Sequence, residues 1–399
     1  MGKRAPTTVV LSFLITVTLV VGLSYWAVQA WPKEPEGALK VPAELVLTPE
    51  MTAQQAQQQS GVTNLALKEA LGLASQEDKS KTLAELGLTP EEAKTKLAAA
   101  MALQQEHATK DFRKIGSKFV LWAAFLTLVF IYFKRRLITP GVRLLFLAFS
   151  LLVFGVLYGA DVSPMGTVKD AIVLWGRDKV VFPPRLIAFA IFLIGILIAN
   201  KFTCGWGCQF GALQDFVFRL NRNEADTQGV MAQWKPPFAL TNTIRTLFFI
   251  GLVVAAIGWG KDLIEPLDPF KTFNPAAFLL SGAVFVGILL ALSLFIYRPW
   301  CHFCCPFGLI GWVFERFSRN RIRVDYDTCI ACEQCAKACP STVMEAILKQ
   351  NRTVPDCFAC AACMQVCPTK SIHFDGAKRE AVPEGKFAAK EEKSAPAQD

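Results

Sequence analysis

The sequence predicts a mainly α, polytopic membrane protein that carries a small, cysteine-rich α+β module near its carboxyl end. Its 399 residues are 53% hydrophobic, with a mean hydropathy of +0.35. Only 19% of them are charged, whereas soluble domains average about 25%. None of the thirteen cysteines precedes Cys204, and they form short, evenly spaced groups. The composition therefore excludes a disordered chain, and the spacing favours metal ligands over a disulfide framework.

Six apolar runs are long enough to cross a membrane. The hydrocarbon core of a bilayer is about 30 Å thick, which a helix of roughly 20 residues spans. The six predicted spans cover residues 8–28, 117–133, 142–160, 184–200, 239–259 and 275–297.

Lysine and arginine indicate the orientation of these spans. Basic residues gather before the first span, between the second and third, between the fourth and fifth, and after the sixth. If the spans alternate, all four groups lie on one face, and the positive-inside rule places that face and both termini in the cytoplasm. This topology explains the net charge of +9 without nucleic acid. We expect a multi-pass protein of the bacterial inner membrane, with every cysteine on or near the cytoplasmic side.

Residues 1–30 form either an uncleaved membrane anchor or a secretory signal. Lys3 and Arg4 precede an apolar run that ends in Val28-Gln29-Ala30, which is also the pattern of a signal with its cleavage site. The apolar run is long for a signal, and its length favours an anchor. The later spans keep their topology under both interpretations.

Residues 31–115 are predicted to form a small periplasmic domain of about four short helices. The sequence Thr89-Pro90-Glu91-Glu92 provides an N-cap, a proline at the first helical position and a capping-box glutamate, and Thr48-Pro49-Glu50 has a similar pattern. Gly72 and Gly87, each between leucines, are typical of helix ends. The segment has no cysteine, no glycine-rich phosphate loop and no paired acidic motif. We therefore expect a docking or spacer role.

Residues 116–319, the predicted membrane domain, contain an internal repeat. The motif Cys204-Gly-Trp-Gly-Cys208-Gln-Phe-Gly aligns with Cys301-His-Phe-Cys304-Cys305-Pro-Phe-Gly, which lies 97 residues later. Each motif follows a span that descends to the cytoplasm. Spans three and four with the first motif, and spans five and six with the second, therefore form two copies of one helical-hairpin unit. Repeated units of membrane proteins often share a site between them.

One pair of thiols from each copy is a candidate for an additional centre at the membrane edge. Four ligands are what one Fe–S centre or one tetrahedral zinc ion needs, and a disulfide is disfavoured in the reducing cytoplasm. Gly207 takes the place of Cys304 in the first copy, so Cys304 is expected to be a packed thiol, and His302 a packed side chain. The four candidate ligands are Cys204, Cys208, Cys301 and Cys305.

The eight remaining cysteines lie within residues 320–377 and form two runs of Cys-x₂-Cys-x₂-Cys-x₃-Cys-Pro. In bacterial two-cluster ferredoxins, three thiolates of such a run bind one [4Fe–4S] cluster and the fourth, before proline, binds the other. Paired structural zinc sites are the alternative, but zinc has no need of this repeated spacing. The predicted ligands are Cys329, Cys332, Cys335 and Cys367 for the first cluster, and Cys357, Cys360, Cys363 and Cys339 for the second.

These motifs predict a C-terminal bacterial two-[4Fe–4S] ferredoxin module. Each half is expected to contain a short strand, a cluster loop and a helix, with strands near residues 323–325 and 371–374. Residues 378–399 alternate Lys, Glu, Ala and Pro and are predicted to be disordered. No histidine lies within a predicted span, so we expect no transmembrane haem.

Paired Cys-x₃-Cys motifs at the ends of membrane helices, followed by a two-cluster ferredoxin module, resemble the membrane polyferredoxins of the NapH and NosR type, over roughly residues 117–377. The resemblance implies anaerobic respiratory electron transport, as in periplasmic nitrate and nitrous oxide reduction, between the quinone pool or cytoplasmic donors and extracytoplasmic partners. Gln209 stands where the family has proline, and the flavin attachment motif of NosR-type proteins is missing. We therefore expect no covalent FMN.

We expect a membrane-bound iron–sulfur electron-transfer protein that relays electrons between a quinone pool or cytoplasmic donor and a respiratory redox partner. It would be a non-catalytic subunit of an oxidoreductase system, with quinol oxidation as the one reaction to consider and no catalytic residue identified. An accessory protein for the assembly of an extracytoplasmic metalloenzyme is the alternative. A transporter is disfavoured because the spans contain almost no ionisable residues.

Overall fold

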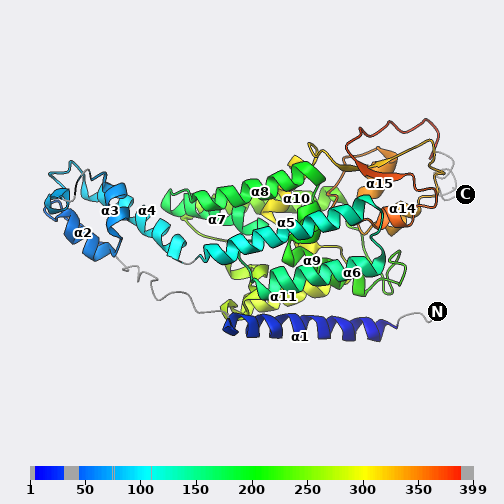
Figure 1. Ribbon diagram of the computed structural model, residues 1–399, viewed down its shortest axis with the longest axis horizontal. Coiled ribbons are helices and arrows are strands. Elements are labelled where there is room, and N and C mark those ends of the chain that lie inside the picture. Colours follow the sequence, from blue (N-terminus) through cyan, green and yellow to red (C-terminus); the bar gives the residue numbers. More distant parts are fainter. Residues whose placement is uncertain (1–4, 31–44, 74, 76, 109, 388–399) are drawn as a thin grey trace, which may run out of the picture.

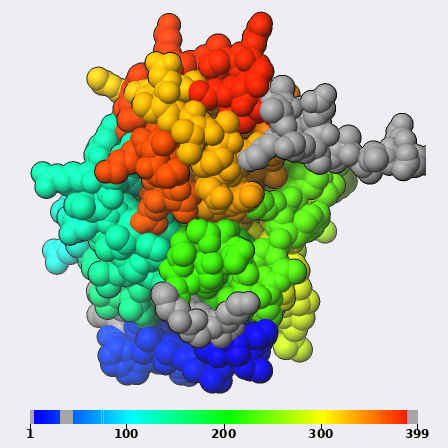
Figure 2. All heavy atoms as spheres, turned by 90° about the vertical axis from the view of Figure 1, so that its right-hand side faces the viewer, coloured from blue at the N-terminus to red at the C-terminus, as the bar shows by residue number. Residues whose placement is uncertain are grey.

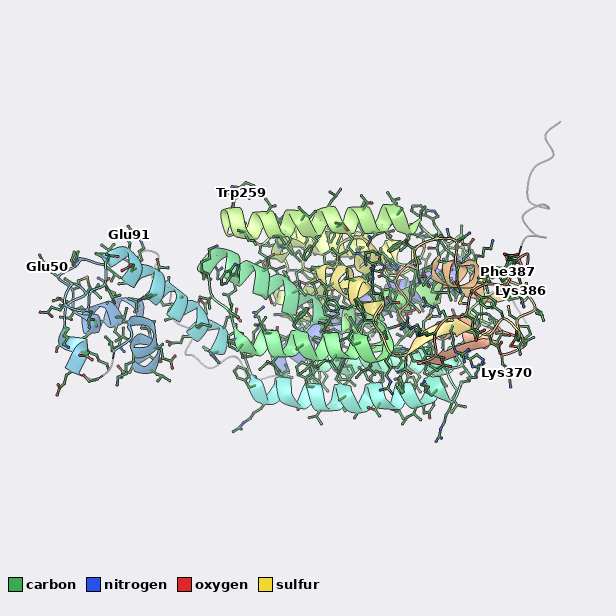
Figure 3. The ribbon with its side chains drawn as sticks, turned by 90° about the horizontal axis from the view of Figure 1, so that it is seen from above. Glu50, Glu91, Trp259, Lys370, Lys386 and Phe387 are labelled. Atoms are coloured by element: carbon green, nitrogen blue, oxygen red, sulfur yellow. The ribbon has the colours of Figure 1, made fainter. Side chains whose placement is uncertain are left out.

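The computed structural model describes residues 5–30, 45–73, 75, 77–108 and 110–387. These residues form an elongated molecule with three parts along its long axis (Figure 1). A small helical domain lies at one end, a bundle of apolar helices in the middle, and the cysteine-rich module at the other end. Glu50 and Glu91 lie in the helical domain, and Lys370 and Lys386 lie at the opposite end of the molecule (Figure 3).

The helical domain packs three short helices and a 3-10 turn around a small apolar core of its own. Its longest helix begins where the sequence predicts, because Glu92 N–H donates to Thr89 Oγ1 (3.3 Å) and Thr89 N–H donates to Glu92 Oε2 (3.2 Å). The elements are α2 (Ala53–Ser60), α3 (Asn64–Leu71), η1 (Glu77–Ser80) and α4 (Pro90–Ala108).

Gly72 ends α3 as predicted, in a left-handed conformation with φ of 71°. Gly87 is also left-handed (φ of 68°), but it ends a turn over residues 83–87, so the helix end predicted there is wrong. The predicted start at Thr48 is wrong. Residues 49–50 form a turn, and α2 begins after Thr52, whose side chain accepts from the N–H of Gln55. The reciprocal Thr52–Gln55 capping box satisfies the free N–H groups of the first helical turn, which the Thr48 pattern does not.

The bundle contains four helices that are long and apolar enough to cross a membrane, and two shorter apolar helices, within the described residues. The shorter two occupy the predicted fourth and sixth spans. The long helices are α1 (Pro6–Ala30), α5 (Phe112–Lys134), α6 (Pro140–Phe149) with its π-helical continuation η2 (Ser150–Leu157), and α10 (Phe238–Trp259). The shorter helices are α8 (Pro183–Ala199) and α11 (Leu280–Leu292).

The outward faces of these helices are apolar. Leu14 of α1, Leu247 of α10 and Leu280 of α11 are 54%, 63% and 82% exposed. Their inward faces, together with Val9, Val20 and Ala27 of α1, belong to one continuous core. A polypeptide surface of this kind is suited to lipid rather than to water.

A helix that the sequence analysis did not predict lies at the end of the bundle nearest the helical domain. This helix, α7 (Pro164–Asp178), packs against α10, and Gly176 leaves no room for a Cβ beside the Ala256 carbonyl. It was missed because its charged residues give the segment the composition of a loop. Three 3-10 turns cover the same end of the bundle: η4 (Glu265–Leu267), η5 (Pro269–Phe273) and η6 (Pro275–Ala277).

Each cysteine motif of the membrane domain turns the chain back into the bundle and begins a short helix. Between α8 and α10 these elements are the π-helical turn η3 (Thr203–Gly207) and α9 (Gln209–Leu220). After α11 they are α12 (Pro299–Phe303) and α13 (Pro306–Glu315). In both segments, an apolar helix is therefore followed by a cysteine-containing turn and a short helix.

The cysteine-rich module is an α+β unit with one two-stranded antiparallel sheet, which pairs β1 (Arg321–Val324) with β2 (Ile372–Asp375). The strands coincide with the predicted ones to within two residues. In the view down the long axis, the module covers the upper part of the molecule's end face, and α1 lies along the lower edge of that face (Figure 2). The helices of the module are α14 (Gln334–Ala338), α15 (Val343–Lys349) and α16 (Ala362–Gln365).

Residues 378–387 differ from the predicted disordered tail, because they pack on the module. Arg379 Nε donates to the Ile322 carbonyl (2.9 Å), and Gln350 Nε2 donates to the Glu380 carbonyl (2.7 Å). Val382 and Phe387 add apolar contacts to the core, which a composition-based prediction of disorder does not weigh. The rest of the predicted tail, 388–399, lies outside the described residues, as do residues 31–44 of the predicted periplasmic domain.

Candidate electron-transfer site

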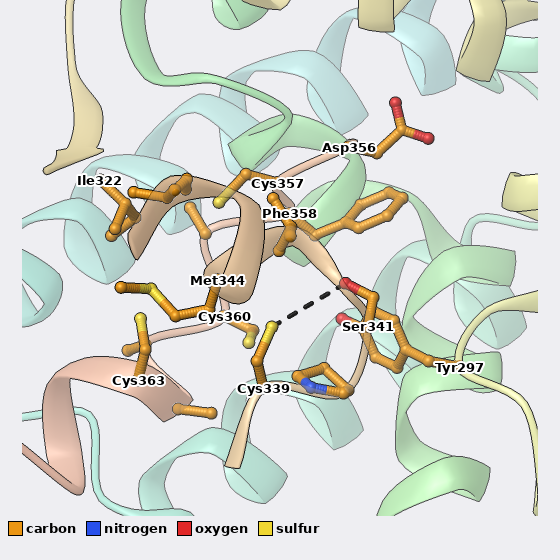
Figure 4. Close-up of a pocket in the computed structure, with 16 residues that line it drawn as sticks. Tyr297, Ile322, Cys339, Ser341, Met344, Asp356, Cys357, Phe358, Cys360 and Cys363 are labelled. Carbon is orange, nitrogen blue, oxygen red and sulfur yellow. Dashed lines mark hydrogen bonds between the residues drawn. The ribbon is translucent and has the colours of Figure 1, made fainter. Parts of the chain in front are cut away.

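Four cysteines of the module surround one buried cavity of about 30 Å³ (Figure 4). They are the four that the spacing assigns to the second cluster. Cys357 and Cys339 are each 6% exposed, and Tyr297, Ile322 and Met344 complete the wall. The thiols in question are Cys339, Cys357, Cys360 and Cys363.

The loops that carry these thiols have the backbone conformation of an anion-binding nest. Ala359 and Ala361 have φ of 47° and 65°, and the equivalent residues Ala331 and Glu333 of the first loop have φ of 52° and 58°. Left-handed residues in such loops direct successive N–H groups to one side, where they hold anions and Fe–S clusters.

Backbone N–H groups donate to the sulfur atoms in both loops. Cys335 receives such a bond from Ala336, Cys357 from Ala359, and Cys339 from Ser341 and Met344. Burial raises the pKa of the Cys335 thiol to about 12, so this sulfur needs a bound cation to become a thiolate near neutral pH.

The first group of cysteines lies nearer to solvent than the second. Cys335 is buried, while the other three are partly exposed and lie within its electrostatic range. Cys335 is also within electrostatic range of Cys363, so the two groups are neighbours. The first group consists of Cys329, Cys332, Cys335 and Cys367.

The second cluster loop rests directly on the two cysteine motifs of the bundle. Trp206 Nε1, in the first motif, donates to the Ala359 carbonyl (3.1 Å). Gly205 allows the Phe358 carbonyl to approach so closely that a Cβ would collide with it. The Phe358 ring packs on His302 of the second motif, with 5.5 Å between ring centroids. The expected packed role of His302 agrees with its 7% exposure.

The four thiols of the repeat converge in the core of the bundle. Each is 8–9% exposed, and electrostatic interactions connect Cys204 with Cys208 and Cys301, and Cys305 with the other three. Cys304, which the repeat leaves unmatched, is more exposed than these four.

Two of these cysteines occupy equivalent N-cap positions of the short helices α13 and α9. Cys305 Sγ accepts a hydrogen bond from Gly308 N–H (3.3 Å) at the start of α13. Cys208 is the N-cap residue of α9, but its side chain makes no capping hydrogen bond. The positive ends of two helix dipoles therefore meet the same group of sulfur atoms, an arrangement that stabilises negative charge there.

The four thiols lie deep in the helix bundle, beside residues at the middle of its long helices, and their predicted position at the cytoplasmic edge of the membrane stays a prediction. Gly207 packs against the Trp122 indole, at the middle of α5, and Trp122 contacts Phe192 of α8 with 5.3 Å between ring centroids. In the second motif Phe307 also contacts Phe192 (6.1 Å). Trp300 contacts Phe248, at the middle of α10 (6.2 Å).

The physical reason for this depth is the apolar character of the residues beside the thiols. Trp206, Phe210, Trp300 and Phe307 are each at most 1% exposed, and burying rings of this size provides a large hydrophobic stabilisation. The motifs therefore turn inward instead of lying at the surface. Topology arguments based on basic residues locate helix ends and do not detect such re-entrant turns.

Two basic residues at equivalent repeat positions cross between the copies. Arg298, which follows Lys201 by the repeat distance of 97 residues, donates to the Cys204 and Gly205 carbonyls (2.6 Å each). Lys201 donates in return to the Gly308 carbonyl (2.6 Å). Each copy thus holds the cysteine turn of the other in place.

Buried positive charge exceeds buried negative charge around the cysteine loops. Arg143 donates to the Cys360 carbonyl (2.7 Å) and Arg222 to the Ala338 carbonyl (2.9 Å), so both cations touch the loops directly. The buried cations are Arg143, Lys201, Arg219, Arg222, Arg245 and Arg298, and the nearby carboxylates are Asp215, Asp226, Asp356 and the partly buried Glu315. A cluster held by four thiolates is an anion, which this excess would neutralise.

Among the described residues, no group of three or more His, Cys, Asp or Glu side chains is arranged to hold one metal ion. Zinc and an Fe–S centre both need four ligands, so the number of thiols alone does not distinguish them.

Sequence reasoning missed the charged partners of this site. Lys201 and Arg298 could have been found as equivalent residues of the repeat, since they stand three positions before Cys204 and Cys301. Asp356, which pairs with Lys201 (2.6 Å) and Arg245 (2.6 Å), has no such marker. It precedes Cys357 by one residue, and from the sequence alone it would be interpreted as an ordinary charged residue of an exposed loop.

Comparisons with protein families identify iron–sulfur domains in both parts of the site. The family described as "4Fe-4S dicluster domain" matches residues 322–374. The family described as "4Fe-4S binding domain" matches residues 181–224 and again residues 278–325. The two latter matches begin 97 residues apart, which is the repeat distance, and each contains one pair of the bundle thiols.

Curated proteins with similar sequences include YccM, NirI and NosR. YccM of Escherichia coli (strain K12), whose name describes an electron transport protein, is 30% identical over 45% of this chain and 52% of its own length. Protein NirI of Paracoccus denitrificans is 28% identical over 44% of this chain and 27% of its own length. Regulatory protein NosR of Pseudomonas aeruginosa is 27% identical over 34% of this chain and 19% of its own length.

The matched region spans about half the length of YccM and about a quarter or less of NirI and NosR. No solved structure matches the chain. The predicted resemblance to membrane proteins of the NapH and NosR type is confirmed by these relatives and by the iron–sulfur domains. The chain therefore contains iron–sulfur domains and is related in sequence to YccM, NirI and NosR.

Proposed function

From this relationship, we propose that the chain relays single electrons between a quinone pool or a cytoplasmic donor and a respiratory redox partner. The observation that carries the proposal is the continuous series of cysteine groups. It runs from the partly exposed first group, through the buried second group, to the four thiols at the middle of the bundle. Bound iron–sulfur clusters would supply one-electron transfer at these groups.

We assign two [4Fe–4S] clusters to the module, with the ligands that the spacing predicts. The left-handed loops, the N–H donors and the shared cavity of the second group support this assignment. The first group comprises Cys329, Cys332, Cys335 and Cys367, and the second comprises Cys339, Cys357, Cys360 and Cys363.

We assign a third iron–sulfur centre to Cys204, Cys208, Cys301 and Cys305. Three observations support this centre: the converging thiols, the two helix N-termini that meet them and the excess of buried cations. Lys201 and Arg298 orient the two cysteine turns through the carbonyl oxygens that they bind. The buried bundle core excludes water from this centre.

We propose a membrane orientation that combines this arrangement with the positive-inside rule. The helical domain and the module lie at opposite ends of the bundle (Figure 1), which supports a periplasmic position for residues 31–115 and a cytoplasmic position for the module in the inner membrane. Its outer partner would be a separate redox protein or respiratory subunit, because the helical domain contains no cysteine and only one histidine.

Iron analysis of anaerobically purified protein tests the ligand assignments. Two four-iron clusters alone would give about eight iron atoms and eight acid-labile sulfides per chain, and a third centre would raise both to about ten or twelve. Stoichiometric zinc with less than about four irons would contradict the ferredoxin assignment. The EPR spectrum after reduction should contain the signals of two interacting clusters.

Serine variants separate the three centres. Replacing Cys204, Cys208, Cys301 and Cys305 together should remove about two to four irons and leave both module signals unchanged. The Cys304→Ser variant is the matched control, because this thiol is adjacent in sequence but is not a proposed ligand. Loss of iron in the control, or loss of the module signals in the quadruple variant, would contradict the third centre.

A further inference from the structure

A large cavity with polar and apolar walls lies at the end of the bundle nearest the helical domain, far from the module. Its volume is about 430 Å³, which is within the usual range for sites that bind small molecules. It lies between the start of α5, the start of α8, the start of α7 and the turn η5. The cavity contains no cysteine and plays no part in the ligand assignments above.

One wall of this cavity is apolar and borders the surface that a bilayer would cover. Phe112, Ile115 and Phe119 of α5 face Ile187 and Ile191 of α8. Ile187 and Ile191 are also 61% and 38% exposed on the outside of the bundle. A ligand with an apolar tail could therefore enter between α5 and α8 without crossing water.

The opposite wall carries charged side chains at the depth of the membrane interface. Asp268 is 15% exposed and lies 3.9 Å from Lys169. Asp161 pairs with Lys110 (2.9 Å) and remains 64% exposed. These side chains provide both carboxylates that can accept protons and ammonium groups that can donate to a carbonyl oxygen.

The cavity is continuous with the cysteine motif of the bundle. A smaller cavity shares Phe119 and Val162 with it and extends to Gly207 and Gln209, the two residues that flank Cys208. Gln209 Nε2 donates to the Ala160 carbonyl (3.0 Å), so the motif contacts the loop that forms the floor of the larger cavity.

Lys118 lies at the junction of the two cavities. Its ammonium group donates to the carbonyl oxygens of Gly159 and Asp161 and is within electrostatic range of the Cys208 thiol. It is 5% exposed, and a cation at this point favours the arrival of negative charge from either side.

We propose that this cavity binds the headgroup of a membrane quinol, with its isoprenoid tail leaving between α5 and α8, and that it is the outer electron entry or exit point of the chain. This inference rests on the proposed electron-transfer function. It adds a redox site on the face opposite the module, which the sequence analysis could not provide.

The reaction balances with groups present in the chain. Oxidation of a quinol breaks two O–H bonds and releases two protons and two electrons, and leaves a quinone. The electrons pass one at a time to the iron–sulfur protein, and the protons pass to the carboxylates of Asp268 and Asp161 and on to the outer solvent. Quinone reduction is the same reaction in reverse.

Gly116 offers a way to fill the cavity without disturbing the fold. It lies in α5 and lines the cavity, and a Cβ at this position meets no atom within 4 Å. The Gly116→Leu side chain would occupy headgroup space, and leucine is a better helix former than glycine. Gly251→Leu in α10 is the matched control, since its Cβ also meets no atom within 4 Å and it does not line the cavity.

Binding is measured first, with a photoreactive azido-quinone in detergent-solubilised full-length protein. Mapping of labelled peptides should place the label on α5 or α8 in the wild type and in Gly251→Leu. The Gly116→Leu variant should lose this label. Equal labelling of all three proteins, or labelling confined to other helices, would overturn the proposal.

Electron exchange is measured second, by following cluster absorbance after addition of a short-chain quinol to oxidised protein and of the quinone to reduced protein. The Gly116→Leu variant should be slower by about a hundredfold, the order expected when a reacting group is displaced by an ångström or more. An unchanged rate, or the absence of exchange in both directions in the wild type, would contradict the quinol site.

Reduction by dithionite is the control that separates a failure of the quinol site from a failure of the proposed electron-transfer function. Dithionite should reduce the clusters equally in all three proteins, because it does not need the cavity. If the purified protein contained no iron–sulfur clusters, the electron-transfer function would be refuted. Azido-quinone labelling of that protein would still show whether the cavity binds quinone. A phospholipid that co-purifies with the wild type but not with Gly116→Leu, while both exchange electrons with quinol equally, would assign the cavity to a structural lipid instead.

Discussion

One buried carboxylate, Asp356, connects the module to both copies of the repeat. Its two oxygen atoms pair with Lys201 Nζ and Arg245 Nη1 at 2.6 Å each, and its side chain is not exposed. Arg245 also donates to the Cys301 carbonyl (3.2 Å). This side chain thus links the second cluster loop to both copies of the repeat, beside the contacts of Trp206 and His302.

The Asp356→Asn variant should be strongly destabilised. It leaves two buried cations with a neutral partner, and breaking a buried ion pair in this way costs about 3–5 kcal/mol. The thermal unfolding midpoint in detergent, together with the iron content of the module, measures the effect. Asp375→Asn is the control, because its pair with Arg323 is 33% exposed on the aspartate side and should contribute less than about 1 kcal/mol. Equal decreases of the unfolding midpoint and of the iron content in both variants would contradict the special role of Asp356.

Asp268 makes stability depend on pH in the outer part of the bundle. Burial raises the pKa of its carboxyl from 3.8 to about 6, against the opposing effect of Lys169. An acid whose pKa is higher in the folded state favours folding when protonated, so stability should fall as the pH rises from about 4 to about 6.

The Asp268→Asn variant should remove this dependence. Its amide oxygen can still accept the hydrogen bond that Phe270 N–H donates (2.9 Å). Between pH 4 and pH 7, the free energy of unfolding of the variant should rise by up to about 3 kcal/mol relative to that of the wild type. Unfolding midpoints measured across this pH range would reveal the difference. A constant difference between the two proteins would show that Asp268 does not titrate in this window.

At the scale of elements, the turn η3 can pack closely on its neighbours because two of its residues, Gly205 and Gly207, have no side chain. Gly205 approaches the Phe358 carbonyl, and Gly207 approaches the Trp122 indole. These close approaches let the turn lie between α5 and the second cluster loop. The second copy achieves its turn with Pro299 and Pro306, which begin α12 and α13.

The Gly205→Ala variant should displace the second cluster loop. A Cβ there collides with backbone, which cannot rotate away, so we expect loss of the second cluster signal in EPR while the first remains. Gly251→Ala, whose Cβ meets no atom within 4 Å, should retain both signals. If Gly205→Ala also retains both, the contact between η3 and the loop does not position the cluster.

At the scale of the whole molecule, the helical domain and the module occupy opposite ends of the helix bundle (Figure 1). The proposed third centre would lie between these ends and would shorten the gap between the two faces. The outer cavity and the module are thereby connected through packed residues of a single chain.

Reporter fusions test this orientation. A periplasm-dependent reporter inserted in the loop near Gly61, between α2 and α3, should be active, and the same reporter fused after Asp399 should be inactive. A cytoplasm-dependent fluorescent reporter should show the reverse pattern. Activity of one reporter at both sites would contradict the topology.

The sequence by itself determined the features that depend on local spacing. Apolar run length located the helices of the bundle, Thr89 and Gly72 marked helix ends, and the repeated cysteine spacing anticipated that Cys339 groups with Cys357, Cys360 and Cys363. These features depend on residues close in the chain or on exact repetition, so a linear pattern carries them.

The tertiary structure alone decided the depth of the four thiols in the bundle, and the outer cavity. It also decided the hydrogen bonds that Lys201 and Arg298 make to the opposite copy, and the buried ion pairs of Asp356. Each of these joins residues that are distant in sequence. The free energy of burying a ring or a charge depends on the atoms that surround it after folding. No single-sequence pattern specifies those neighbours, and they are what places the proposed redox sites within reach of one another.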